Sequence, residues 1–205
     1  FSSSAAIFGN PEYIPIDEGH PTNPINPYGK SKLMVEEILK DFESAYGLKY
    51  VSFRYFNAAG HDPDGELSER HDPETHLLPI IMQVANGQRD SVSIFGNDYD
   101  TNDGTCVRDY IHVNDLANAH LKGLDYLNQS ESSSAEFNLG NGNGFSVKEV
   151  IQQVKDITGK DFVVMEEGRR DGDPSTLIAS DKKARRELSL FPGYASLESI
   201  IKTLN

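Results

Sequence analysis

A tyrosine and a lysine lie four residues apart at the start of a predicted helix, and their chemistry suits proton transfer. The two residues are Tyr28 and Lys32. A spacing of four places both side chains on one face of a helix, with about 5–6 Å between their Cβ atoms. A free phenol has a pKa near 10, so about one molecule in a thousand is ionised at pH 7. A positive charge beside the phenol favours the ionised form, which can act as a general base.

The lysine alone supplies too little free energy for this role. Lowering the pKa of a phenol from about 10 to about 7 requires roughly 4 kcal/mol. A positive charge about 6 Å away contributes about 2.8 kcal/mol at an effective dielectric constant of about 20. A second positive charge, such as that of an oxidised nicotinamide ring, would supply the rest. The same spacing also occurs on ordinary exposed helices, so the pair by itself does not establish a site.

Three serines at residues 2–4 provide a chemical partner for this pair. They lie at the end of a predicted strand, about two dozen residues before the tyrosine and separated from it by a proline-rich loop. A serine hydroxyl at this position could share a hydrogen bond with the oxygen that the tyrosine deprotonates. The serine, the tyrosine and the lysine together predict a catalytic site.

Composition excludes several classes of partner. The chain has 19 basic and 32 acidic residues, which gives a net charge of −13. Nucleic acids and anionic membranes attract basic surfaces, so neither is expected as a partner. No stretch approaches the roughly 20 apolar residues of a membrane span. The one cysteine, Cys106, cannot form an internal disulfide bond, and we therefore expect a cytoplasmic protein.

The elements that position the site alternate between helix and strand, which is typical of an α/β protein. Asn26 and Pro27 predict the start of the helix that carries the tyrosine, and Gly47 predicts its end. Residues 50–56 form a strand that is too continuously apolar to be half exposed, so we expect it in the centre of a sheet covered on both faces. Residues 57–60 are a polar loop at the carboxyl end of this strand, where open α/β sheets bind ligands.

The remaining pattern predicts four more helices and four more strands. Ser146 and Glu149 form a capping box at the start of one helix, and Asp115 and Asp181 are expected to cap two others. Residues 130–134 are expected to form a surface loop. The helices are expected over 77–86, 115–128 and 146–157 and from 181 to about 188, and the strands over 91–95, 110–113, 137–139 and 161–166.

The histidines do not predict a metal site. The chain has six histidines and one cysteine, and no histidine has the spacing to cysteine that zinc sites commonly show. His71, His76 and His112 are therefore expected to be polar groups of loops or of the core. We predict that the protein has no metal site.

Four segments, taken in order, resemble the extended short-chain dehydrogenase/reductase family. They read F-S-S-S-A from residue 1, P-Y-G-K-S-K from residue 27, R-Y-F-N from residue 54 and R-D-Y-I-H-V-x-D from residue 108. Each motif alone is weak, but the ordered set extends over essentially the whole chain. The resemblance implies an incomplete Rossmann-like, doubly wound parallel sheet plus a smaller α/β substrate-binding lobe. Residues 1–58 would belong to the NAD-binding domain and 59–205 mainly to the lobe, with about 109–145 returning to the Rossmann sheet.

Within this family, the chain most resembles members that invert a UDP-hexose at C4. Such an enzyme interconverts UDP-glucose and UDP-galactose in galactose metabolism, through a 4-keto sugar and with tightly bound NAD. The resemblance also implies a homodimer formed through a helix bundle that includes residues 28–46. Other nucleotide-sugar epimerases or decarboxylases of the family stay open as alternatives, as does a non-catalytic nucleotide-sugar-binding fragment. A dehydratase is disfavoured because Ser4 is followed by Ala5 and Ala6 instead of an Asp-Glu pair.

The resemblance assigns roles to individual residues. Ser4, Tyr28 and Lys32 are the implied catalytic residues and also contact NAD, with Tyr28 as the acid/base and Lys32 on the nicotinamide ribose. Phe56 is the other implied cofactor residue. Two arginines would bind the diphosphate, for which a guanidinium is well suited. The implied substrate-binding residues are Asn57, Leu77, Phe95, Arg108, Arg170, Asp173 and Leu177, the last beside the 2-substituent of the sugar.

One part of the family pattern is missing from the chain. The glycine-rich loop that would bind the pyrophosphate of NAD does not occur in it. Phe1 resembles the end of a buried strand whose earlier part is absent. We therefore expect a fragment of a longer enzyme, inactive when isolated.

Overall fold

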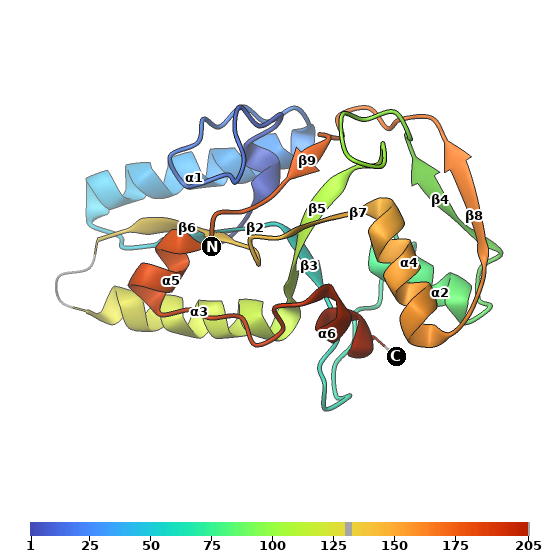
Figure 1. The fold of residues 1–205 in the computed structure, drawn as a ribbon. Coiled ribbons are helices and arrows are strands. Elements are labelled where there is room, and N and C mark those ends of the chain that lie inside the picture. Colours follow the sequence, from blue (N-terminus) through green and yellow to red (C-terminus); the bar gives the residue numbers. More distant parts are fainter. Residues whose placement is uncertain (130–132, 205) are drawn as a thin grey trace.

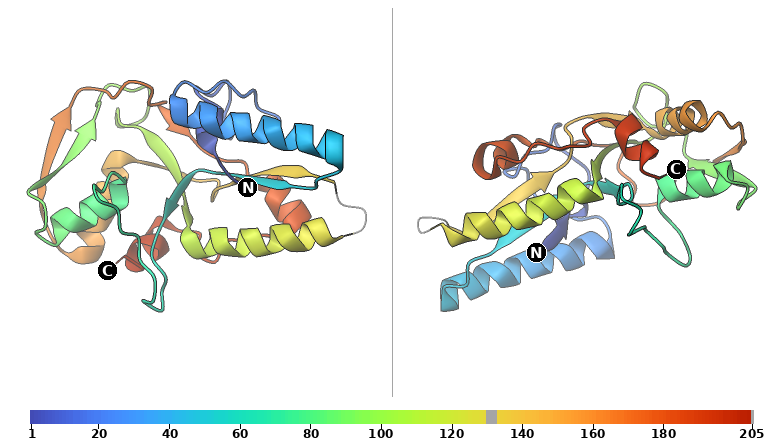
Figure 2. Two further views of the ribbon diagram at one scale, coloured as in Figure 1. Left: turned by 180° about the vertical axis from the view of Figure 1, so that it is seen from behind. Right: turned by 90° about the horizontal axis from the view of Figure 1, so that it is seen from below.

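The computed structural model describes residues 1–129 and 133–204 and contains strands flanked by helices (Figure 1). The first sheet is parallel, with the order β1 (Ser2–Ser4), β2 (Val51–Tyr55) and β6 (Ala135–Leu139). The prediction of a central strand is confirmed, because β2 lies between its two partners and all but its last residue are buried. Figure 2 shows helix α1 (Pro27–Tyr46) and helix α3 (Val113–Asn128) on opposite faces of this sheet.

The side chains of β2 alternate between these two faces. Val51 and Phe53 belong to an apolar core shared with α3, β6 and α5 (Lys182–Leu188). Arg54 points to the other face, where it contacts α1. Alternation of this kind follows from the two-residue repeat of a strand. The two faces therefore have different chemistry, one apolar and one with a buried charge.

The predicted bounds of α1 are confirmed. The side chain of Asn26 accepts a hydrogen bond from the backbone nitrogen of Gly29 at 2.8 Å, as expected of an N-cap residue. Pro27 occupies the first helical position, where its missing N–H removes no helical bond. Gly47 ends the helix with a φ of 68°, a left-handed conformation that glycine adopts without strain.

A second group of strands connects the first sheet to the far end of the molecule. Strand β5 (Val107–His112) pairs in parallel with β3 (Asn57–Ala59) and β9 (Thr176–Leu177), and antiparallel with β7 (Gly144–Ser146). Strands β4 (Ser91–Phe95) and β8 (Val163–Glu167) form a separate parallel pair. Helices α2 (Leu77–Ala85), α4 (Val147–Thr158) and α6 (Leu197–Lys202) share one apolar core with them.

Several predicted boundaries need correction. Residues 57–59 are not a loop but strand β3, because they pair with β5. Helix α3 begins at Val113, since the His112 ring accepts from the backbone of Asn114 and acts as the N-cap in place of Asp115. Helix α6 was not predicted, although Ser196 and Ser199 form a reciprocal cap at its start. Residues 130–132 of the predicted loop at 130–134 lie outside the described residues.

The predicted capping box of α4 is present. The hydroxyl of Ser146 accepts from the backbone of Glu149, and the Glu149 carboxylate accepts from the backbone of Ser146. None of the helices in the described part of the chain has the length and apolar character of a membrane span.

Candidate active site

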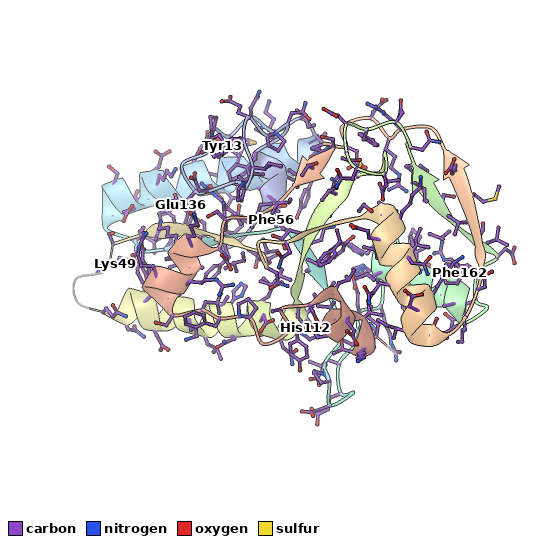
Figure 3. All side chains as sticks on the ribbon, viewed as in Figure 1. Tyr13, Lys49, Phe56, His112, Glu136 and Phe162 are labelled. Carbon is purple, nitrogen blue, oxygen red and sulfur yellow. The ribbon has the colours of Figure 1, made fainter. Side chains whose placement is uncertain are left out.

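A pocket of about 180 Å³ lies where β1 and β2 end. Strands β1 and β2 are parallel, so their carboxyl ends meet at one edge of the sheet. Figure 3 shows Phe56, which follows β2, near the middle of the molecule. Five residues predicted for the site line this pocket, namely Ser4, Phe56, Asn57, Asp173 and Leu177. They come from three distant parts of the chain.

Helix α1 begins beside the same pocket, since its N-cap, Asn26, is one of the lining residues. A Cβ atom on Gly29 would lie 2.3 Å from the backbone oxygen of Ala6. Only glycine therefore permits the first turn of α1 to approach the short 3-10 helix η1 (Ala5–Ile7) this closely. This close approach brings the segment after Ser4 next to the turn that carries Tyr28.

The side chains of Tyr28 and Lys32 lie close together, as the spacing predicted. The Lys32 Nζ atom is 5.5 Å from the centre of the Tyr28 ring. Lys32 also donates a hydrogen bond to the backbone oxygen of Ser2 at 3.0 Å, which ties α1 to β1. The Tyr28 side chain is 55% exposed, so its phenol is open to a ligand.

The hydroxyl of Ser4 has one interaction fixed by the fold. Ser4 is the N-cap of η1, and its Oγ atom accepts a hydrogen bond from the backbone nitrogen of Ala6 at 3.2 Å. Because this contact uses a lone pair, the hydroxyl hydrogen stays available for donation to a ligand oxygen.

Sequence reasoning missed Glu36, which holds α1 against the sheet. Its carboxylate is fully buried and accepts from Arg54 Nη2 at 2.6 Å and from Arg54 Nε at 3.0 Å. The hydroxyl of Ser3 donates to the same carboxylate. Glu36 lies four residues after Lys32, so a continuation of the i, i+4 series was the signal that could have revealed it. This ion pair fixes α1 relative to both β1 and β2.

Besides Tyr28 and Lys32, four further predicted residues lie outside the lining of this pocket. Arg108 Nη2 donates to Asp173 Oδ1 at 2.7 Å, and this contact places the guanidinium next to the pocket that Asp173 lines. The guanidinium of Arg170 lies 3.6 Å from the centre of the Phe95 ring, an arrangement typical of a cation–π contact. Leu77 begins α2 and packs against the core at the far end of the molecule.

A buried carboxylate fixes the strand that carries Arg108. Asp109 accepts backbone hydrogen bonds from Asn141 at 2.8 Å, Gly142 at 3.0 Å and Ala179 at 3.1 Å. Burial raises the pKa of Asp109 to about 6, although the three backbone N–H groups act in the opposite direction. The carboxylate thereby connects β5 with the segments that follow β6 and β9.

Comparison with known proteins decides the family. Residues 1–140 match the model of the NAD dependent epimerase/dehydratase family. The chain belongs to this family. NAD is therefore its cofactor, and the predicted α/β fold with Rossmann-like parallel strands is confirmed.

Several proteins with similar sequences and structures are named UDP-glucose 4-epimerase. The UDP-glucose 4-epimerase of Halalkalibacterium halodurans is 54% identical over 202 residues, which cover 98% of this chain and 60% of that protein. The crystal structure of UDP-glucose 4-epimerase from Brucella ovis in complex with NAD has a TM-score of 0.94 and 48% identity, and the match covers 99% of this chain and 62% of that one. The enzyme from Bifidobacterium longum, solved with NAD⁺ and UDP, has a TM-score of 0.93 and 38% identity, with 99% and 61% covered. The chain spans about 60% of the length of these relatives.

Proposed function

We propose that the protein to which this chain belongs interconverts UDP-glucose and UDP-galactose by inverting C4 of the sugar. The observation that supports the proposal is a pocket at the carboxyl ends of two parallel strands that is lined by Ser4 and by Asn26, the N-cap of the helix that carries Tyr28 and Lys32. The 54% identity to a protein named UDP-glucose 4-epimerase supports the same substrate. The reaction belongs to galactose metabolism, and we assign it to the cytoplasm because Cys106 is buried and unpaired.

The residues beside the pocket fit the nicotinamide half of NAD. Phe56 offers an apolar surface in the pocket lining, and Lys32 offers an ammonium group suited to ribose hydroxyls. Ser4 and Tyr28 would complete the set of cofactor contacts. When it is bound, NAD supplies the acceptor and donor of hydride.

Tyr28 moves the proton in this proposal. Its phenolic oxygen accepts the proton of the sugar 4-hydroxyl as C4 is oxidised, and it returns the proton after the sugar has presented its other face. The ammonium group of Lys32 lies beside this phenol, with its Nζ atom 5.5 Å from the ring centre. Ser4 donates its free hydroxyl hydrogen to the same sugar oxygen, which keeps that oxygen in line with the phenol.

The substrate residues divide between the sugar and the nucleotide. Asn57 and Leu177 line the pocket, which supports a position beside the sugar, with Leu177 next to the 2-substituent. Arg108 is oriented by Asp173 and Arg170 by Phe95, so both guanidinium groups are held for the diphosphate. We propose that Asp173 binds the uridine ribose and that Leu77 and Phe95 contact the uridine and the diphosphate.

We assign residues 1–58 and about 109–145 to the NAD-binding part and the rest mainly to the substrate lobe. The pairing of β6 with β2 supports the return of the chain to the first sheet.

We further propose that the protein is a homodimer formed through α1. Its outer face carries large apolar side chains that are about half exposed or more, and such a patch is typical of an interaction surface. These side chains are Met34, Ile38, Phe42 and Tyr46.

The test is the rate of UDP-galactose conversion by the purified full-length protein. Tyr28→Phe is expected to lower kcat by about 10²–10⁴-fold, the usual range for a lost acid–base group. Tyr46→Phe is the matched control, because Tyr46 lies at the other end of the same helix and is 79% exposed. A Tyr28→Phe variant that keeps more than about a tenth of the rate would contradict the proposed base. UDP-sugar binding without turnover by the wild type would favour the binding alternative, and decarboxylation of a UDP-uronic acid would favour the decarboxylase.

A further inference from the structure

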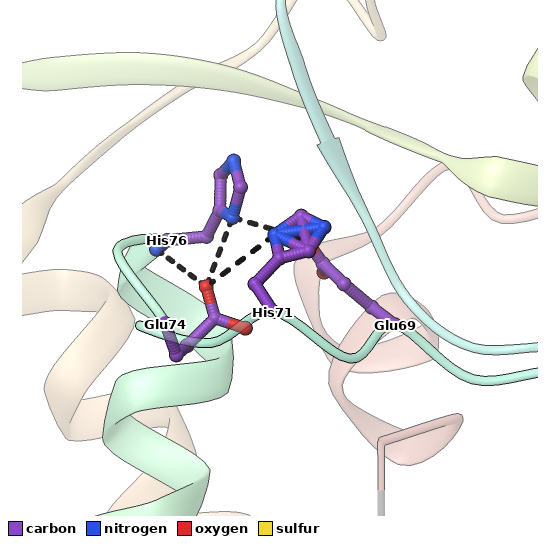
Figure 4. Close-up of side chains that lie close together, drawn as sticks. All are labelled: Glu69, His71, Glu74 and His76. Atoms are coloured by element: carbon purple, nitrogen blue, oxygen red, sulfur yellow. Dashed lines mark hydrogen bonds and ion pairs between the residues drawn. The ribbon is translucent and has the colours of Figure 1, made fainter.

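Four side chains between β3 and α2 converge on one point. They are Glu69, His71, Glu74 and His76, and Figure 4 shows them turned toward one another. One potential ligand atom from each residue lies within 4.8 Å of the other three. His71 and His76 were expected to be polar groups of loops or of the core, because the sequence shows no cysteine at the spacing of common zinc motifs.

We propose that these four residues form a binding site for a divalent transition-metal ion of the zinc type. Two imidazole nitrogens and two carboxylate oxygens are a donor set that zinc accepts. Bond lengths of 2.0–2.2 Å in a tetrahedral site place neighbouring ligand atoms about 3.3–3.6 Å apart.

The distances in the cluster scatter around this value. His76 Nδ1 lies 2.9 Å from Glu74 Oε1 and 3.0 Å from Glu69 Oε1. His71 Nδ1 lies 3.6 Å from Glu69 Oε1 and 4.0 Å from Glu74 Oε1. Shifts of less than 1 Å in these contacts would produce the tetrahedral spacing.

The charge of the cluster suits a dication. The two carboxylates of the cluster supply negative charge that a divalent ion neutralises. The rings of His71 and His76 have their centres only 4.7 Å apart. Two imidazole rings this close together can bind one metal ion.

Part of the site is held in place by the backbone. The Glu74 side chain is 3% exposed, and its Oε1 atom accepts from the backbone nitrogens of Thr75 at 2.7 Å and His76 at 2.8 Å. A fixed ligand reduces the loss of side-chain entropy on binding.

Metal ions can reach the cluster from solvent. The side chains of His71 and His76 are 44% and 51% exposed. Glu69, His71 and Glu74 also line a cavity of about 390 Å³ next to α2. The site therefore has an entry path from solvent.

The site has a structural consequence for the lobe. His76 directly precedes Leu77, the first residue of α2. A bound ion would tie the segment at 69–76 to the start of this helix. If Leu77 contacts the substrate, as the proposed function states, the ion would also position that contact.

The test is titration of the metal-stripped full-length protein with Zn²⁺ by calorimetry, and with Co²⁺ by visible absorption. We expect one equivalent to bind and Co²⁺ to give the intense bands of a four-coordinate site. His71→Ala and Glu69→Gln are each expected to weaken binding at least tenfold. Glu69→Gln keeps the size of the side chain, so it serves where the histidine variant folds poorly.

Two variants control for nonspecific effects. His61→Ala removes an imidazole from the same cavity, and Glu66→Gln removes a charge from the same connection, but neither residue is in the cluster. Both are expected to leave the affinity unchanged. Millimolar or weaker binding by the wild type, or equal losses in cluster and control variants, would overturn the site.

Metal binding is measured independently of turnover, so the two proposals can fail separately. A protein that binds Zn²⁺ at the cluster but converts no UDP-sugar would support the site and refute the proposed function. An active enzyme that binds no Zn²⁺ would support the function and refute the site.

Discussion

Helices α1 and α4 have the same local signals but opposite burial. Each begins at a side chain that caps its first turn, and each ends at a left-handed glycine, Gly47 or Gly159. In α4 the buried side chains are apolar, and they fill the core that α4 shares with α2 and α6. In α1 the side chains of Met34, Ile38 and Phe42 are about half exposed, and a buried glutamate faces the sheet. Apolar periodicity therefore shows which residues share a face, but not which face packs inward.

The difference reflects what each helix does. The face of α1 next to the sheet carries Tyr28 and Lys32 at its start and Glu36 further along. Polar groups on this side position the proposed catalytic residues, and the apolar side is the surface that we propose for dimerisation. Helix α4 packs in an apolar core and carries none of the proposed site residues.

The largest expected effect tests the buried face of α1. Glu36→Ala should lower the free energy of unfolding by about 3–5 kcal/mol, because it leaves Arg54 buried without a counter-ion. Denaturant unfolding measures this change. Glu37→Ala, at the exposed neighbouring position, should change stability by less than about 0.5 kcal/mol. Similar losses of stability in Glu36→Ala and Glu37→Ala would show that the buried face of α1 has no special role.

A pair of isoleucines tests the comparison directly. Ile151 of α4 is 5% exposed and Ile38 of α1 is 50% exposed. Ile151→Ala should cost about 3 kcal/mol at every protein concentration, because it opens a cavity in the core.

Ile38→Ala should instead act on assembly. We expect a loss of stability that grows with protein concentration, since the proposed dimerisation would stabilise the wild type. Light scattering should give a higher monomer fraction for this variant. A monomeric wild type at micromolar concentration would contradict the proposed role of the outer face.

Gly29→Ala tests the close approach of α1 to η1. A methyl group at this position would lie 2.3 Å from the Ala6 oxygen and push Tyr28 away from Ser4. We expect kcat to fall by about 10²-fold, as for a misplacement of roughly 1 Å. Gly168→Ala is the control, because its added Cβ would meet nothing within 4 Å. An unaffected Gly29→Ala enzyme would show that this spacing does not matter for catalysis.

The smallest expected effect concerns the pH dependence that Asp109 causes. This carboxylate is buried like that of Glu36, but within residues 1–129 and 133–204 it has no ion pair. Because the pKa of Asp109 is raised to about 6 in the folded state, the folded protein binds a proton more readily than the unfolded chain between about pH 4 and pH 6. Stability from this group therefore rises as pH falls, by about 1 kcal/mol from pH 7 to pH 5. The measurement is the free energy of unfolding of wild type and Asp109→Asn at both pH values. The free energy of unfolding of the wild type, relative to that of Asp109→Asn, should be about 1 kcal/mol higher at pH 5 than at pH 7. An identical pH dependence of the two proteins would contradict the raised pKa.

The amino-acid sequence by itself determined the features that depend on near neighbours. The start and end of α1 follow from Asn26, Pro27 and Gly47, and the capping box of α4 follows from Ser146 and Glu149. The proximity of Tyr28 and Lys32 follows from the helical repeat. Continuous apolar character predicted the central position of β2. The caps and the Tyr28–Lys32 pair depend on contacts within a few residues, so short sequence patterns predict them. The position of β2 follows from its composition, because a strand covered on both faces is apolar throughout.

Only the tertiary structure decided the features that join distant segments. Residues 57–59 are polar enough for a loop, but pairing with β5 makes them a strand. Glu36 is an ordinary helical residue until Arg54 and Ser3 meet it in the interior. The convergence of Glu69, His71, Glu74 and His76 also depends on how their connection folds onto α2. In each case the structure depends on a partner that only the folded chain brings to the residue, and the residue type alone does not specify that partner.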